Sequence, residues 1–201
     1  NAIVGFSNLL AETDDIGERR EYMRVVEENN ELLLKLISDI LDLSKIEAGT
    51  FEFNYGRVDV NRMCEETVRS LSLKVKDKPV ELIFGEHDAQ CCVVGDKNRL
   101  IQVITNFINN AVKFTDEGSI TLGYRTEGGE LLFHVEDTGS GISEEHRQSI
   151  FDRFVKLDPF SQGMGLGLAV CRLIAGALGG GVELDTSYTE GARLTLTIPI
   201  V

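Results

Sequence analysis

Two asparagines and a lysine recur at one-turn spacing in a segment that is otherwise mostly apolar. Asn106, Asn110 and Lys113 would share one face of a helix, because residues three and four positions apart are neighbours on a helix surface. An asparagine carbonyl oxygen is a neutral ligand that suits Mg²⁺, which binds few protein groups and keeps several waters. A lysine amine adds a positive charge suited to phosphate. The pattern predicts a magnesium and phosphate site, with a solvated helix face as the alternative.

An acidic residue followed by glycines forms a second candidate site. Asp137 comes after an apolar segment and precedes Gly139 and Gly141. An ionised carboxylate only accepts hydrogen bonds, so it could accept from the exocyclic amine of adenine but would repel the carbonyl that guanine has there. The glycines allow the backbone to approach a base closely and to adopt positive φ. The alternative is an ordinary Asp-Thr-Gly turn.

A glycine-rich segment, Gly163-Met-Gly-Leu-Gly167, leads into a helix predicted to begin near Leu166. The N–H groups and positive end of such a helix suit phosphate groups. Leu168 stands where a dinucleotide fingerprint needs its third glycine, and the chain has no Gly-Lys dipeptide. Both a Rossmann site and a P-loop are therefore excluded, and a glycine-hinged flap over a nucleotide remains.

Aromatic residues precede this flap. Phe151 and Phe154 are three positions apart, and Lys156 and Pro159 follow them. The spacing and the proline predict a short helical turn that runs into a mobile segment. The alternative is that both rings are plain core residues.

These four stretches, in this order, resemble the N, G1, F and G2 boxes of sensor histidine kinases. The resemblance covers almost the whole chain and implies a Bergerat (GHKL) domain that binds ATP and Mg²⁺, with Asn110 as the metal ligand and Phe114 near the adenine. It implies that the mobile segment is a lid with Phe151 and Phe154 at its base. It also implies roles in phosphoryl transfer for Asn106, Lys113 and Lys156. It implies the following nucleotide-binding residues: Asn106, Asn110, Lys113, Phe114, Asp137, Gly139, Gly141, Ile142, Lys156, Gly163, Gly165, Leu166 and Gly167. The segment 191–194 departs from the family's last box, so no nucleotide contact is expected there.

The spacing of apolar residues predicts the helices that position these residues. Apolar residues at helical spacing predict an antiparallel hairpin of helices at 2–11 and 18–48. Segment 41–49 resembles the end of the second dimerisation helix of these kinases, and the apolar stripe before it predicts a homodimer, with packing on the rest of the same chain as the alternative. Further helices are expected at 61–76 (capped by Asn61), 96–115 (capped by Asp96) and 166–178.

Short strands complete the second part of the chain. They are expected at 58–60, 80–84, 91–94, 118–126, 130–136, 182–187 and 193–200. Helices mixed with mainly antiparallel strands predict an α+β, two-layer α/β sandwich preceded by the helical hairpin. We expect two domains, a truncated dimerisation and histidine-phosphotransfer hairpin at 1–49 and a catalytic ATP-binding domain at 50–201.

Composition narrows the classes of partner. The net charge of −13 argues against nucleic acid, whose phosphates would be repelled. The four cysteines form no zinc pattern, so reduced thiols and a cytoplasmic location are expected. No apolar run is long enough to span a bilayer, so direct membrane contact by this segment is not expected.

The phosphoacceptor histidine is the missing part. His87, His134 and His146 are the histidines of the chain, and none has the sequence context of the family's acceptor. Asn1-Ala-Ile-Val-Gly-Phe-Ser7 resembles the segment directly after that acceptor, which is therefore expected just before Asn1. Asn106 stands where hydrolysing GHKL members carry a glutamate, and an amide cannot act as a general base near neutral pH.

The sequence therefore predicts an ATP-dependent protein-histidine kinase that passes phosphate to an aspartate of a response-regulator receiver. The alternatives are a non-catalytic ATP-sensing dimerisation module, and a GHKL ATPase or serine kinase. An intact set of Asn106, Asn110, Lys113 and Asp137 speaks against the first alternative, and the hairpin speaks against the second.

Overall fold

The structure is a computed structural model that describes residues 2–156 and 164–200, apart from the side chain of Lys74. It opens with an antiparallel hairpin of α1 (Ala2–Glu12) and α2 (Ile16–Glu47). The Asp15 side chain caps α2 by accepting from the backbone N–H of Glu18, as expected for an N-cap aspartate. The rings of Phe6 and Tyr22 pack across the two helices with centroids 5.7 Å apart. The predicted hairpin is confirmed.

The second part of the chain is a sheet covered by helices. Five strands lie in the order β2-β4-β5-β7-β6; β2 and β4 are parallel and the other neighbours are antiparallel. The strands are β2 (Val80–Phe84), β4 (Gly118–Glu127), β5 (Glu130–Asp137), β6 (Gly181–Leu184) and β7 (Arg193–Pro199). A separate antiparallel pair joins β1 (Gly56–Asp59) to β3 (Cys92–Gly95).

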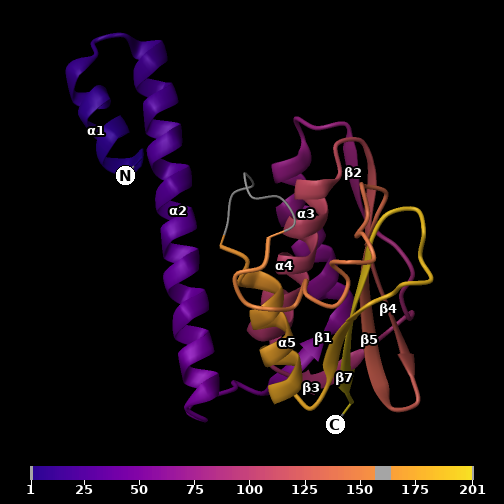
Figure 1. The fold of residues 1–201 in the computed structure, drawn as a ribbon. Coiled ribbons are helices and arrows are strands. Elements are labelled where there is room, and N and C mark those ends of the chain that lie inside the picture. Colours follow the sequence, from indigo (N-terminus) through magenta and orange to yellow (C-terminus); the bar gives the residue numbers. More distant parts are fainter. Residues whose placement is uncertain (1, 157–163, 201) are drawn as a thin grey trace.

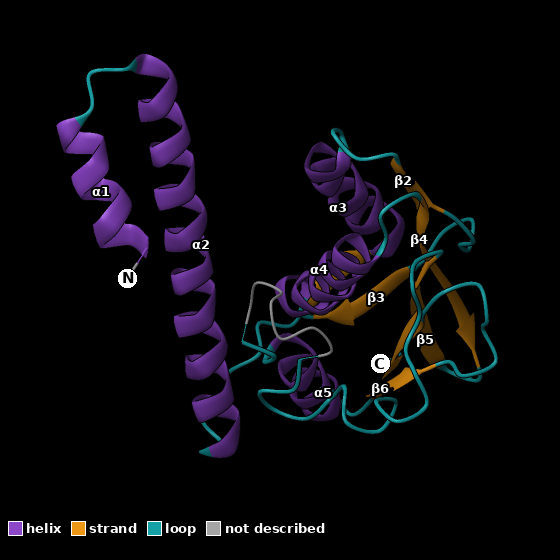
Figure 2. Cartoon of the chain, turned by 45° about the horizontal axis from the view of Figure 1, so that its top comes forward, coloured by secondary structure: helices purple, strands orange, loops and turns teal. Residues whose placement is uncertain are grey.

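Three helices lie together on one face of the five-stranded sheet (Figure 1). They are α3 (Val60–Val75), α4 (Lys97–Phe114) and α5 (Gly167–Ala177). The α1–α2 hairpin stands on the side of this helix layer that faces away from the sheet, as the second view also shows (Figure 2). The predicted two-layer α/β sandwich preceded by a helical hairpin is confirmed.

Large apolar side chains fill the space between sheet and helices. Tyr124 and Phe133 come from the sheet, and Phe107 and Met63 come from the helices; each is at most 1% exposed. Burial of such side chains is the main favourable term that holds the two layers together. The face of α4 that packs on the sheet is thereby fixed, and this orientation decides which of its polar residues lie at the cavity described below.

In helix α2 the buried positions are acidic and many large apolar side chains are exposed, which is the reverse of an ordinary surface helix. Its buried residues are two aspartates, Asp39 and Asp42. Its large apolar side chains are instead exposed by 45–60%: Leu33, Leu34, Ile37, Ile40 and Leu41. The predicted alternative, in which the apolar stripe packs on the rest of the same chain, holds in part: Leu32, Leu36 and Leu43 are half-buried and Ile46 packs against the core, whereas the five side chains named above stay exposed.

Some predicted boundaries shift. Helix α3 is capped by Asp59, whose carboxylate accepts from the N–H of Arg62, and not by Asn61. Asn61 instead uses its amide to donate to the carbonyl oxygens of Asp88 and Ala89. Strand β6 ends at Leu184 because Asp185 turns the chain by accepting from the N–H and hydroxyl of Ser187.

The described residues contain no helix that is both long and apolar enough to cross a membrane.

Candidate functional site

A cavity of about 100 Å³ opens between α4, the ends of β5 and β7, and the segment that leads into α5; we call it the first cavity. Most of its wall is apolar, with charged and amide groups at its two ends. Its lining residues are Phe107, Asn110, Ala111, Lys113, Phe114, Val135, Asp137, Gly141, Ile142, Ile150, Val155, Lys156, Gly165, Leu168, Ala192 and Leu194. Such an apolar cleft with few polar groups is typical of small-molecule sites.

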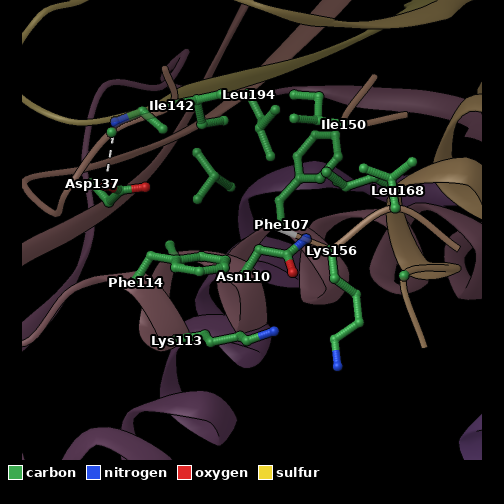
Figure 3. Close-up of a pocket in the computed structure, with 16 residues that line it drawn as sticks. Phe107, Asn110, Lys113, Phe114, Asp137, Ile142, Ile150, Lys156, Leu168 and Leu194 are labelled. Atoms are coloured by element: carbon green, nitrogen blue, oxygen red, sulfur yellow. Dashed lines mark hydrogen bonds between the residues drawn. The ribbon is translucent and has the colours of Figure 1, made fainter. Parts of the chain in front are cut away.

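Asp137 forms one end of the first cavity, as Figure 3 shows. The side chain is 7% exposed, and its Oδ1 accepts from the N–H groups of Gly139 at 2.9 Å and Ala192 at 3.3 Å. Burial raises the pKa of the Asp137 carboxyl, and these two backbone hydrogen bonds offset part of the effect. With Oδ1 held by the backbone, the carboxylate is oriented so that its Oδ2 can accept from a ligand.

Close backbone approaches around Asp137 require glycine. A Cβ at Gly139 would lie 2.2 Å from the carbonyl oxygen of Phe114, and one at Gly191 would lie 2.0 Å from that of Asp137. Gly141 has φ of 68°, which L side chains rarely adopt. Gly139 does not line the first cavity itself; it holds the Asp137 carboxylate in place.

Amide and ammonium groups gather at the other end of the cavity. Asn110, Lys113 and Lys156 lie away from Asp137 in Figure 3, and the amines of both lysines extend from the apolar part of the wall. The amine of Lys113 lies 5.0 Å from the centroid of the Phe114 ring, which is a cation–π distance. The first cavity is thus acidic at one end and basic at the other.

A second cavity of about 180 Å³ adjoins this basic end, between α4 and α2. It shares Asn110, Lys113 and Gly165 with the first cavity, and Leu166 and Gly167 also line it. The remaining lining residues are Leu32, Lys35, Leu36, Asp39, Asn106, Asn109 and Met164. The sequence predicts Asn106 beside Asn110, but the structure places Asn106 only in this second cavity.

Asn106 is 5% exposed, so the alternative of a solvated face is wrong for this residue. Its Oδ1 accepts from the amine of Lys35 at 2.8 Å. Its Nδ2 has no hydrogen-bond partner among the described residues, and its polar neighbour there is the thiol of Cys171, a weak acceptor. A buried amide with unused donors is unusual in a fold of this kind.

The glycine-rich segment contacts the aromatic one. The carbonyl oxygen of Gly165 accepts from the N–H of Phe154 at 3.0 Å, and Gly165 has φ of 70°. Phe151 is buried, whereas Phe154 is 61% exposed with φ of 65°. The alternative that both rings are plain core residues is therefore wrong for Phe154, and the anchoring of a lid by the two rings stays a prediction. Gly163 and the predicted mobile lid lie in 157–163, outside the described residues.

Several cavity residues were not predicted from the sequence. Ala192 and Leu194 belong to the segment for which no contact was expected, yet both line the first cavity. Alternation along β7 buries Leu194, and the register of β7 against β5 brings Ala192 to Asp137. The other unpredicted lining residues are apolar: Phe107, Ala111, Val135, Ile150, Val155 and Leu168. In the sequence these residues are visible only as apolar positions of strands and helices, and such a pattern does not distinguish a cavity wall from the core.

The described residues contain no group of three or more His, Cys, Asp or Glu side chains that could hold a metal ion by themselves. His134 lies in β5, where burial lowers the pKa of its imidazole, and His87 stacks on Phe84 with centroids 4.4 Å apart. His146 pairs with Ser143 and Glu145 at the surface. None of these three histidines lines either cavity.

Comparisons with known proteins agree with this geometry. Residues 95–201 match the family model "Histidine kinase-, DNA gyrase B-, and HSP90-like ATPase", and residues 1–49 match "His Kinase A (phospho-acceptor) domain". The chain is 35% identical over 201 residues to Sensor protein TorS of Escherichia coli K12, covering 98% of this chain and 22% of TorS. It is 36% identical to Sensor histidine kinase RcsC of the same strain, covering 86% of this chain and 19% of RcsC.

Among solved structures, the crystal structure of full-length ShkA in complex with AMPPNP superposes with a TM-score of 0.82. The identity is 29%, and the alignment covers 100% of this chain and 42% of ShkA. The chain thus spans about a fifth of the length of the two E. coli relatives. The two matched domains, the confirmed fold and the two-ended cavity together show that the chain belongs to the sensor histidine kinase family.

Proposed function

We propose that the first cavity binds ATP with Mg²⁺. The observation that carries this proposal is the arrangement of the cavity, with a buried, oriented carboxylate at one end and an amide and two amines at the other. Asp137 would accept from the adenine amine, and Phe114, Gly141 and Ile142 would surround the base. The structure of ShkA, which was solved in complex with AMPPNP, supports the same class of ligand.

The triphosphate would run toward the basic end. Lys113 and Lys156 would contact phosphate oxygens, and Gly165 with Leu166 and Gly167 would offer backbone N–H groups where α5 begins. The oxygen of Asn110 would be the protein ligand of Mg²⁺, which completes its shell with waters and phosphate oxygens. The ion would neutralise charge on the phosphates during transfer.

Asn106 favours transfer to a protein side chain over hydrolysis. Its amide cannot take a proton from water near neutral pH. Transfer to an imidazole depends mainly on positioning and charge neutralisation, because the imidazole is already nucleophilic. We therefore assign a protein-histidine kinase activity, with the acceptor histidine just before Asn1 and a response-regulator aspartate as the next acceptor.

The hairpin would form the homodimer. Its exposed apolar stripe on α2 and the match of residues 1–49 to a phospho-acceptor domain support this assignment, with 50–201 as the catalytic domain. The cysteines Cys64, Cys91, Cys92 and Cys171 are free thiols, which fits a reducing, cytoplasmic location.

Labelling with γ-³²P-ATP tests the proposal. A longer chain that includes the segment before Asn1 should acquire a label that is stable to alkali and labile to acid, as phosphohistidine is. The same chain carrying Asp137→Asn should be labelled much more slowly at an ATP concentration that does not saturate the wild type. Release of inorganic phosphate without protein labelling would favour the ATPase alternative, and nucleotide binding with neither product would favour the non-catalytic module.

A further inference from the structure

The outer wall of the second cavity comes from the hairpin and not from the catalytic part of the chain. Helix α2 contributes Leu32, Lys35, Leu36 and Asp39 to a space whose other wall is α4 and the start of α5. The cavity continues the first one beyond Asn110 and Lys113. An extended nucleotide with its base at Asp137 would direct its last phosphate into this space.

Lys35 brings a positive charge from α2 into the second cavity. Its amine donates to Oδ1 of Asn106 at 2.8 Å, across 71 positions of sequence. The Lys35 side chain is otherwise exposed, so it can reorient without disturbing the core. A neutral amide oxygen is a weaker partner for an ammonium group than an anionic phosphate oxygen, because hydrogen bonds between charged groups are shorter and stronger.

We propose that Lys35 binds the terminal phosphate of the nucleotide, so that a residue of the dimerisation hairpin completes the phosphate site. This inference rests on the proposed function of the first cavity. Lys35 exchanges its contact with Asn106 for a γ-phosphate oxygen when ATP is present, whereas the shorter ADP leaves the Lys35–Asn106 contact in place. Lys35 thereby distinguishes ATP from ADP and senses the nucleotide from the hairpin side.

The carboxyl group of Asp39 lies in the same cavity, and the positive charge of Lys35 is needed to offset it when a phosphate enters. It lies one helical turn after Lys35, is 5% exposed and lines the same cavity. Burial raises the pKa of the Asp39 carboxyl, Lys35 lowers it, and the neighbouring Asp42 raises it. An ionised Asp39 without Lys35 would repel an incoming phosphate, so Lys35 both attracts the phosphate and offsets this carboxylate.

Calorimetric titration of the chain with Mg²⁺ and either ADP or the non-hydrolysable analogue AMPPNP tests the assignment. Lys35→Met should weaken AMPPNP binding about tenfold, the size of one charge-assisted hydrogen bond, and leave ADP binding within about twofold of wild type. Lys35→Arg should restore most of the preference for AMPPNP. Lys45→Met is the matched control, because Lys45 is an exposed lysine of the same helix outside both cavities.

Equal weakening of both nucleotides would show that Lys35 acts through the structure of the site, and unchanged or tighter AMPPNP binding would show that it makes no phosphate contact. Either result overturns the proposed role of Lys35. The proposed function is supported separately if the wild-type chain binds ADP. If wild type bound neither nucleotide, the proposed function itself would fail. Asp39→Asn provides a second check, since removing the carboxylate should tighten AMPPNP and not ADP.

Discussion

Asp137 is the residue on which recognition of the base depends. Its carboxylate is buried, yet Gly139 and Ala192 hold one oxygen and leave the other directed to the cavity. Asp137→Asn keeps the size of the side chain but places an amide donor beside the donor on adenine. Hydrogen bonds to charged groups contribute about 1.5–3 kcal/mol, so we expect ADP affinity to fall about 10- to 100-fold.

Calorimetry with ADP measures this loss, and Asp116→Asn is the control because Asp116 is an exposed aspartate outside both cavities. The Asp137→Asn chain should unfold at a denaturant concentration close to that of wild type at neutral pH or slightly above it. Full retention of ADP affinity by Asp137→Asn would contradict the assigned role.

The same residue predicts a dependence of stability on pH. Because burial raises the pKa of the Asp137 carboxyl, the folded protein holds this proton at pH values where the unfolded chain has released it. This group therefore destabilises the fold as pH rises from the ordinary pKa of an aspartate to its raised value, and the effect is constant above that. The free energy of unfolding of Asp137→Asn relative to wild type should increase over the same interval. A pH-independent difference between the two chains would argue against the raised pKa.

Among the elements, the loop between β5 and α5 depends on Gly165. A Cβ at this position would lie 2.3 Å from the carbonyl oxygen of Val155, and its φ of 70° disfavours any L side chain. Gly165→Ala should therefore displace the loop and weaken nucleotide binding at least tenfold, as calorimetry with AMPPNP would measure. Gly176→Ala, in helix α5 with open space around its Cβ position, should keep affinity and gain about 0.5–1 kcal/mol of stability.

The contact between α2 and α4 is polar and specific. Oδ2 of Asp42 accepts from Arg99 at 3.0 Å and from Gln102 at 2.9 Å, and the Arg99 guanidinium lies 4.4 Å from the centroid of the Phe51 ring. Asp42→Ala removes the acceptor that these two partly buried side chains share, while Arg99 still donates to Gln102. The loss should cost about 1–3 kcal/mol in the free energy of unfolding.

Chemical denaturation measures this cost, with Glu28→Ala as the control. Glu28 pairs with Arg24 on the exposed surface of the same helix, where such pairs contribute less than about 1 kcal/mol. Hydrogen exchange should also speed up in α2 near Asp42 in the Asp42→Ala chain. An equal loss in the free energy of unfolding for both substitutions would mean that Asp42 does not stabilise the packing of α2 on α4.

The elements and their order could be predicted from local sequence, whereas contacts between distant segments could not. Asp96 caps α4 as predicted, because the signal is an aspartate directly before a helical pattern. The sequence favours Asn61 as the cap of α3 because Asp59 lies in a predicted strand, and both residue types are good caps. The partnership of Lys35 with Asn106, and that of Asp42 with Arg99, arise only when the hairpin packs on α4. No local pattern encodes such a contact.

At the scale of the whole molecule, α2 exposes five large apolar side chains that the rest of the described chain does not cover. Leu34 is 60% exposed and Ile37 48%, on the helix whose buried positions are aspartates. Exposed apolar stripes of this length are expected to pair with another helix. Leu34→Glu should therefore shift the chain from dimer toward monomer in sedimentation experiments. Leu73→Glu, which changes a 71% exposed leucine of α3, should leave the association unchanged. A wild-type chain that is monomeric at high concentration would contradict the dimer.

Binding of Mg-ATP in the first cavity, through Asp137 at one end and Asn110 at the other, is the property from which the proposed kinase activity follows. Calorimetric titration of the chain with ATP and with GTP, each with and without Mg²⁺, is the decisive measurement. We expect ATP to bind and GTP not to, because the Asp137 carboxylate accepts from the adenine amine and repels the guanine carbonyl. Removing Mg²⁺ should weaken ATP binding. Equal binding of the two nucleotides, or of neither, would contradict this assignment.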